Sequence, residues 1–155
     1  MSNEIKSKFG ASTALSITLA SLASSTTGAG RQSAMVDNST SRFGLVHLFV
    51  KVTLGTSPTA NKTVQIYLLK GESSGLRTDA AGSGDAALTV KNAPLVGVMT
   101  TGSSPGSGDV LQRHFTIREP GPEWGIVIVH DTGAALSSNA ANHAIRYVGD
   151  NLEVQ

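Results

Sequence analysis

The densest run of apolar residues lies in the middle of the chain, in two segments joined by a short polar loop. In Phe43–Leu54, β-branched and aromatic residues are too closely spaced for a solvated loop and lack the 3.6-residue stripe of an amphipathic helix. In Lys62–Lys70, Val64, Ile66 and Leu68 alternate with more polar residues and so share one face. The loop contains Gly, Pro and Asn, which favour turns, so we predict an antiparallel hairpin with one core-facing side.

Shorter segments of the same character flank this hairpin and are separated by turn-forming residues. Trp124–His130 is apolar throughout and is predicted to be a strand buried on both faces. Val110–Ile117 alternates, and Arg113 interrupts its otherwise apolar face. Further strands are predicted at 31–36, 95–100 and 144–148, with a weak one at 88–90 and an extension at 152–154.

The N-terminal stretch has two interpretations. Two lysines precede an apolar, small-residue segment, which superficially resembles a secretory signal. However, Leu15, Ile17 and Leu19 alternate with hydroxyl-bearing residues, whereas the core of a signal is continuously apolar. We therefore predict a strand here, preceded by a mobile or partner-ordered arm at residues 1–10.

These segments amount to about eight strands and no long helix. A chain of 155 residues suits one domain, so we predict a single all-β domain at 11–155, an antiparallel β-sandwich or jelly roll. The longest predicted loop covers 71–87, where Gly, Ser, Ala and Asp dominate and large side chains are almost absent. Loops of this length are often functional or ordered by a partner.

Composition narrows the classes of partner. The chain has no cysteine, which excludes disulfides, thiol nucleophiles and cysteine-ligated zinc. Charged residues make up 15% of the chain and the formal net charge is +1, so we expect no nucleic-acid or membrane partner. A low surface charge favours self-association. Protein partners are therefore expected, including further copies of this chain.

Two motifs that suggest hydrolytic chemistry have simpler interpretations. Gly102–Gly106 matches the G-x-S-x-G pattern of a nucleophile elbow, but Pro105 and the following glycines prevent the required helix from starting after Ser104. We interpret this motif as a β-turn. Glu119 and Glu123 flank a Pro-Gly-Pro bend without an apolar cleft around them, and are expected to be solvated loop acids rather than a glycosidase pair.

The four histidines and the single tryptophan are also expected to be structural. The histidines fall on separate predicted strands or their ends without a local metal-binding spacing, although convergence of three of them in space remains the alternative. Trp124 begins the most apolar strand and is expected to anchor the core rather than to form an exposed carbohydrate platform. We therefore expect no enzyme activity, no cofactor and no metal site. The histidines are His47, His114, His130 and His143.

Four segments in combination resemble a known group of proteins. Ala14–Ser25, Arg31–Asn38, Trp124–Leu136 and Asn142–Tyr147 are similar, in sequence and in order, to small virion structural proteins of tailed bacteriophages. These are all-β chains found near the major capsid gene. The similarity touches both ends of the chain and skips its middle, and none of the segments is a chemical signature.

The resemblance implies a non-enzymatic capsid decoration or cement protein. Such a protein binds across subunits of the major capsid protein on the capsid exterior, often as a homotrimer, and is made in the host bacterial cytoplasm. The arm residues Lys6, Lys8 and Phe9 are then candidate capsid contacts, with the 71–87 loop as a second candidate. A tail, neck or baseplate component is the alternative function, and a carbohydrate-binding module or fibre tip is a further one.

Overall fold

The computed structural model describes residues 5–72 and 74–154, and the regular secondary structure of this part of the chain is almost entirely β-strand. Two short 3₁₀ helices, Thr78–Ala80 and Ala140–Asn142, interrupt the strands. None of the described helices is long and apolar enough to cross a lipid bilayer. The strands are β1 (Ile5–Phe9), β2 (Thr13–Ala14), β3 (Ala29–Gln32), β4 (Val36–Asp37), β5 (Leu45–Thr53), β6 (Thr63–Gly71), β7 (Ala86–Thr89), β8 (Leu95–Thr100), β9 (Val110–Arg118), β10 (Glu123–His130) and β11 (Ala144–Val154).

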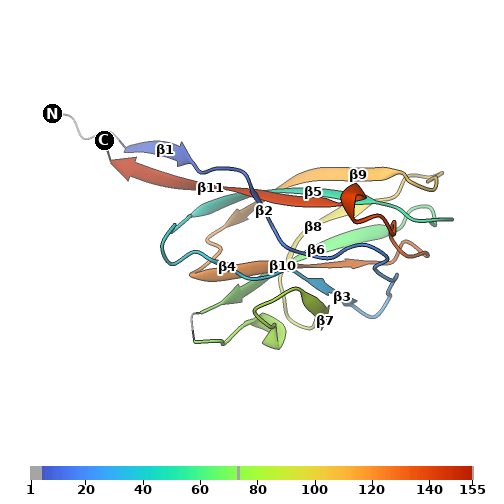
Figure 1. Ribbon diagram of the computed structural model, residues 1–155, viewed down its shortest axis with the longest axis horizontal. Helices are drawn as coiled ribbons and strands as arrows, with labels where there is room; N and C mark the ends of the chain where they lie inside the picture. The colour runs from blue at the N-terminus through green and yellow to red at the C-terminus, as the bar shows by residue number, and fades with distance from the viewer. Residues whose placement is uncertain (1–4, 73, 155) are drawn as a thin grey trace.

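The strands form two antiparallel sheets that face each other, which confirms the predicted β-sandwich (Figure 1). Sheet A has the order β1-β11-β5-β9, and β2 also pairs with β11. Sheet B has the order β7-β3-β10-β6-β8, and β4 also pairs with β10. The described residues thus hold eleven strands rather than about eight, because β1, β2 and β4 are added to the predicted set.

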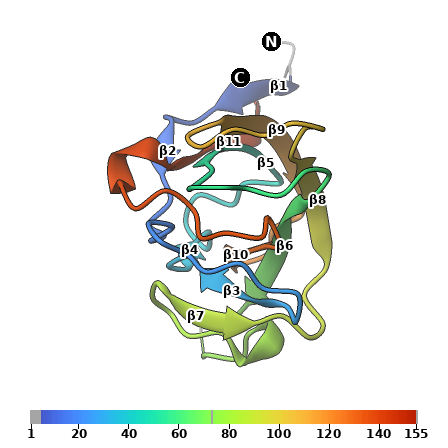
Figure 2. The same ribbon diagram turned by 90° about the vertical axis from the view of Figure 1, so that its right-hand side faces the viewer.

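Eight of these strands pair in a nested order. β2 pairs with β11, β3 with β10, β5 with β9 and β6 with β8. Each pair is therefore enclosed, along the chain, by the pair before it. Figure 2 shows β8 and β9 side by side at one margin of the sandwich. There Arg113 donates from Nη1 to the carbonyl of Val98 at 2.8 Å and lies over the ring of Phe115. Its position at this margin explains why an arginine occupies the apolar face of β9.

The predicted hairpin between residues 43 and 70 is wrong, although both of its strands exist. β5 belongs to sheet A and β6 to sheet B, so they pack face to face instead of pairing. Val46, Val50 and Ile66 are all fully buried between the two sheets. The loop at 54–62 therefore crosses the roughly 10 Å between layers. A local apolar pattern is the same for a hairpin and for such a crossing, and only the long-range pairing distinguishes them.

The prediction of a strand over Leu15–Leu19 is also wrong, although apolar residues of this segment do face the core as the alternating pattern indicates. Leu15 and Leu19 are buried in the core, whereas only β2, just before them, joins a sheet. The Leu15 amide donates to Ile145 of sheet A, and the Ser16 carbonyl accepts from Ala34, next to β3. This segment therefore closes the open side of the sandwich by bonding to both layers.

The N-terminal arm differs from the unpaired segment that the sequence suggests. Residues 1–4 lie outside the described residues, but Ile5–Phe9 forms β1, which pairs with the end of β11 from Asp150 to Val154. Together the two strands make a ribbon that projects from the body of the sandwich (Figure 1). The chain can form this ribbon because β11 is longer than its other partner, β5.

Central strand β10 confirms the burial expected for Trp124–His130. Seven consecutive residues of this strand are buried, from Trp124 onwards. The Trp124 side chain is fully buried and packs edge-on against Tyr147 of the opposite sheet, as expected for a core anchor. Its neighbours point alternately into the inter-sheet core and into a smaller cluster on the outer side of sheet B that includes Leu69, Val127 and Val129.

The 71–87 segment is a loop that side-chain hydrogen bonds hold against sheet B. Gln32 of β3 donates to the carbonyls of Gly82 and Gly84, at 2.9 and 2.6 Å. Arg31 forms an ion pair with Asp85. Burial alone would raise the pKa of Asp85, but hydrogen bonds from Arg31 and Thr18 outweigh it and lower that pKa. The loop is therefore fixed to β3.

Candidate binding surface

The four histidines separate into two that bond within the fold and one pair at the surface. His130 is buried and bonds to Thr132 and to the Leu22 carbonyl, and burial lowers its pKa. His143 is half-buried and donates from Nε2 to the Ser137 carbonyl at 2.9 Å. These three hydrogen bonds are structural, as expected. In contrast, the half-buried His47 and the exposed His114 meet on the outer face of sheet A, and no local spacing in the sequence indicates this pair.

The surface pair belongs to a row of four rings, which we call the aromatic row: Phe9, His47, His114 and Phe49. Ring centroids of Phe9 and His47 lie 5.8 Å apart, those of His47 and His114 5.3 Å, and those of His114 and Phe49 5.0 Å. Within the row, His47 Nδ1 and His114 Nε2 are 3.1 Å apart. The row therefore runs across three strands, β1, β5 and β9, on one face of the sheet.

Strand alternation places these rings outside. On β5, His47 and Phe49 alternate with Val46, Leu48 and Val50, which are fully buried. A two-residue period turns successive side chains to opposite faces, so the buried residues fix the outward direction of the others. The same rule could have identified the pair from the sequence, but only if the pairing of β5 with β9 had been known.

The projecting ribbon continues the aromatic row with exposed apolar side chains. Ile5 is 68% exposed, Phe9 62% and Leu152 75%. Ile5 and Phe9 share a face of β1 because they are four residues apart, and Leu152 lies opposite Ser7 of that same face. Lys6 and Lys8 are also exposed and alternate with them, so they fall on the other face. The structure thus separates the three candidate contact residues onto two faces of the ribbon.

Cations flank the aromatic row. Three cations occupy outward positions of sheet A. Lys51 lies two residues after the outward-facing Phe49 on β5, and Arg146 pairs with Phe49. Arg118 pairs with Leu45, which shares the face of Phe49. Among the described residues, Asp150 is an acid at an outward position of sheet A, and it accepts a hydrogen bond from Ser7. The outer face of sheet A is therefore apolar and aromatic along its centre and net positive around it.

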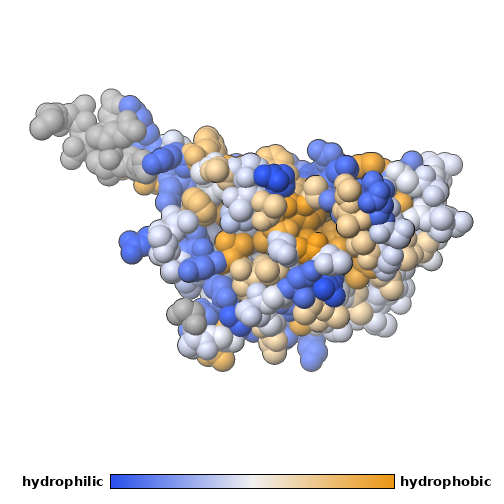
Figure 3. Space-filling view, in the orientation of Figure 1, coloured by the Kyte–Doolittle hydropathy of each residue, from blue (hydrophilic) through white to orange (hydrophobic). Residues whose placement is uncertain are grey.

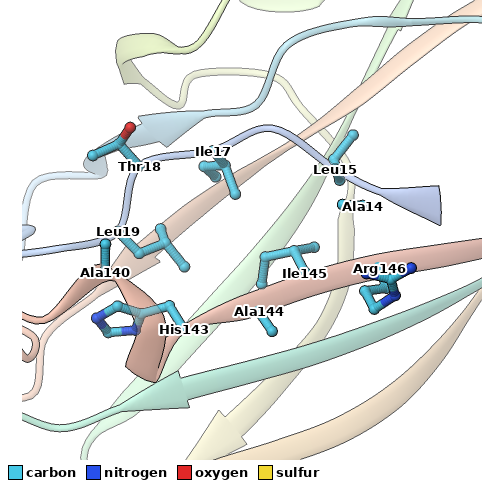
Figure 4. A pocket seen from close by; sticks show the side chains of 10 residues that line it. All are labelled: Ala14, Leu15, Ile17, Thr18, Leu19, Ala140, His143, Ala144, Ile145 and Arg146. Atoms are coloured by element: carbon cyan, nitrogen blue, oxygen red, sulfur yellow. The ribbon is translucent and has the colours of Figure 1, made fainter.

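A hollow lies on another side of the molecule, between the 14–19 segment and the start of β11. Hydrophobic residues gather in the middle of the face shown in Figure 3. The hollow has a volume of about 290 Å³ and is lined mainly by apolar side chains (Figure 4). His143 also lines it, with Nε2 already bonded to the Ser137 carbonyl, and Arg146 lies at its rim. No carboxylate is among the described residues that line the hollow.

The motifs that suggest hydrolytic chemistry lie apart from each other and from this face. Ser104 is exposed in the turn between β8 and β9, as predicted. Glu123 accepts two hydrogen bonds from Arg77, both at 2.8 Å, so it is not the solvated loop acid that the sequence suggests. Glu119 is exposed, and its backbone carbonyl accepts from Lys70 Nζ.

Comparison with protein-family models, curated proteins and solved structures finds no match for this chain. The features of the molecule that bear on its function are therefore the fold, the projecting ribbon and the outer face of sheet A.

Proposed function

We propose that this chain is a non-enzymatic virion structural protein of a tailed bacteriophage. In this proposal it decorates the capsid exterior by binding across subunits of the major capsid protein. The observation that carries the proposal is the projecting ribbon, which presents Ile5, Phe9 and Leu152 to solvent beside the aromatic row. Contiguous exposed apolar groups of this kind mark interaction surfaces.

The nested strand order supports the same class of protein. Pairing of the first strand with the last, the second with the second last and so on is the order of a jelly roll, a fold that occurs in viral capsid proteins as well as in lectins and cupins. The fold alone does not imply a function. It agrees with the resemblance of four sequence segments to phage virion proteins.

The energetics suit a decoration protein. Each of Ile5, Phe9 and Leu152 would contribute about 1.5–3 kcal/mol when fully removed from water. A protein that binds the assembled shell and not its free subunits stabilises the shell by mass action. Many copies, each bound with modest affinity, then raise the free energy needed to separate capsid subunits. Chemistry is not required for that role.

The assembly we propose is a homotrimer at three-fold or quasi-three-fold positions of the capsid. Closed rotational symmetry favours such an arrangement because the same surface of each copy meets equivalent capsid subunits. The ribbon of each copy would reach over a neighbouring capsid subunit, with Phe9 on one face and Lys6 and Lys8 on the other. The chain would be made in the host bacterial cytoplasm and end on the virion surface.

Two other functions predict different behaviour. A tail, neck or baseplate component would use the same ribbon but would occur in few copies per virion. A carbohydrate-binding module or fibre tip is favoured by the aromatic row, since exposed rings are stacking surfaces for sugars. Against that function, Phe9 is tilted by 54° from His47 and Phe49 by 36° from His114, so the row is not a flat platform.

The proposal is tested by adding the purified chain to phage shells that lack it and measuring co-sedimentation. We expect saturable binding to assembled shells, no binding to unassembled major capsid protein, and a raised temperature of shell disruption. Glycan-array binding without shell binding would instead support the carbohydrate-binding function. Failure to bind either shells or isolated tails would contradict a virion role.

A further inference from the structure

We propose that His47 and His114 form a binding site for one divalent transition-metal ion, such as Zn²⁺, on the outer face of sheet A. The pair joins two strands that lie 67 residues apart in the sequence, β5 and β9. This inference is independent of the capsid proposal, because it concerns only two side chains and their geometry.

The two imidazoles already point their nitrogens at each other. His47 Nδ1 and His114 Nε2 are 3.1 Å apart, whereas the two ring centroids are 5.3 Å apart. The ring planes differ by 19°. The nitrogens therefore face one another close to the line that joins the rings. At this distance both nitrogens are within reach of a single ion.

The separation fits a bound ion with little movement. Zinc to imidazole distances are about 2.0–2.1 Å, and a tetrahedral angle between two such bonds places the nitrogens about 3.4 Å apart. The nitrogens would need to separate by a few tenths of an ångström, and each ring would need to turn so that its lone pair points at the ion. Both belong to strands paired along nine residues, from Leu45 to Thr53, so their backbones are already held in position.

Neutral imidazole nitrogen is a good ligand for Zn²⁺, Cu²⁺ and Ni²⁺ and a poor one for Ca²⁺ or Mg²⁺, which prefer oxygen. No group of three or more His, Cys, Asp or Glu side chains among the described residues is arranged to hold a metal ion. The proposed site therefore has two protein ligands, with water in the remaining positions. Phe9 and Phe49 flank the pair and limit where those waters can lie.

Titration of the purified chain with ZnCl₂, followed by calorimetry and by side-chain ¹⁵N NMR of the histidines, tests the site. We expect one ion per chain, with shifts at His47 and His114 and none at His130 or His143. Loss of even an outer-shell partner costs a metal site about 10–100-fold in affinity. His47→Asn and His114→Asn should each weaken binding by at least that factor.

The matched control is His143→Asn, which removes a histidine from a different part of the fold and should leave zinc affinity unchanged. The NMR readout on the unmodified chain does not depend on any variant folding. Absence of saturable zinc binding, shifts confined to His143, or unchanged affinity in both pair variants would each overturn the site.

Discussion

At the residue scale, two glycines are required because aromatic rings lie against them. A Cβ at Gly97 of β8 would overlap the ring of Phe115, and one at Gly149 of β11 would overlap the ring of Phe43. The rings fill the space that a side chain would take, so these positions belong to the packing of the sandwich. Pairing of an aromatic ring with a strand glycine is a known way to stabilise such positions.

Replacement of Gly97 by alanine is expected to destabilise the fold by about 1–3 kcal/mol, because the methyl group would displace the buried Phe115 ring. Gly44→Ala is the matched control, since a Cβ there meets nothing within 4 Å. We expect the control to be neutral or slightly stabilising. Urea unfolding of both variants measures the difference, and equal midpoints would contradict this account of Gly97.

Inward and outward positions are the part of the structure that residues alone predict well. Val64, Ile66 and Leu68 face the core as their alternation indicates, and Trp124 is buried as its apolar neighbours indicate. The row formed with His47 could not be predicted, because its members come from three strands whose pairing is a long-range property. Local sequence fixes which face a side chain takes but not which neighbours it meets there.

At the element scale, the loop before β8 is stabilised by one carboxylate. Asp79 has a left-handed backbone, φ 56°, and accepts hydrogen bonds from the amides of Lys91, Asn92 and Ala93. Burial alone would raise the pKa of Asp79, but these amides outweigh it and lower the pKa below its ordinary value. Its charged form therefore ties the 3₁₀ turn at 78–80 to the residues before β8.

Because the pKa of Asp79 is lower in the folded chain, its stabilising contribution is complete above the ordinary carboxyl pKa of about 4. The contribution is lost as the pH falls through the lowered value. Asp79→Asn keeps the side-chain shape and tolerates a left-handed backbone but removes the charge. We expect the variant to be less stable at pH 7, with the difference shrinking below about pH 4. A pH-independent difference in urea midpoints would contradict a charge effect.

The ribbon of β1 and β11 is the element on which binding is predicted to depend. Ile5→Ser with Phe9→Ser should weaken shell binding about tenfold or more, since exposed anchors carry interface energy. Both side chains are exposed, so the thermal midpoint should change little. Leu95→Ser is the matched control, because Leu95 is 53% exposed but lies on β8 of sheet B. Equal loss of binding in the control would show that general surface hydrophobicity, and not the ribbon, is responsible.

The sequence predicts the positions of individual strands better than it predicts which strands pair. β8, β9 and β10 are strands at nearly the expected residues. The hairpin of β5 with β6 was wrong because a short loop can either turn back or cross to the other layer. β1 was missed as a strand because its residues are mostly polar and exposed, and its pairing depends on the distant end of β11.

At the scale of the whole molecule, the sandwich combines a buried core between the sheets with one outer face that carries exposed apolar side chains. The buried side chains between the sheets account for the fold, whereas the outer face of sheet A and its ribbon carry exposed apolar groups that the core does not need. Net positive charge around this face favours a partner surface with acidic groups. These features make the outer face of sheet A, rather than the hollow beside the 14–19 segment, the surface on which the proposed capsid role depends.

The proposed role is tested most directly by quantitative mass spectrometry of purified virions, with and without tails, that measures the copies of this chain per major capsid subunit. The capsid proposal predicts a copy number of about one per major capsid subunit, unchanged when tails are removed, as expected for occupancy of symmetric sites over the whole shell. A ratio of a few per hundred capsid subunits, or absence from tail-less heads, would contradict capsid decoration and assign the chain to the tail or neck.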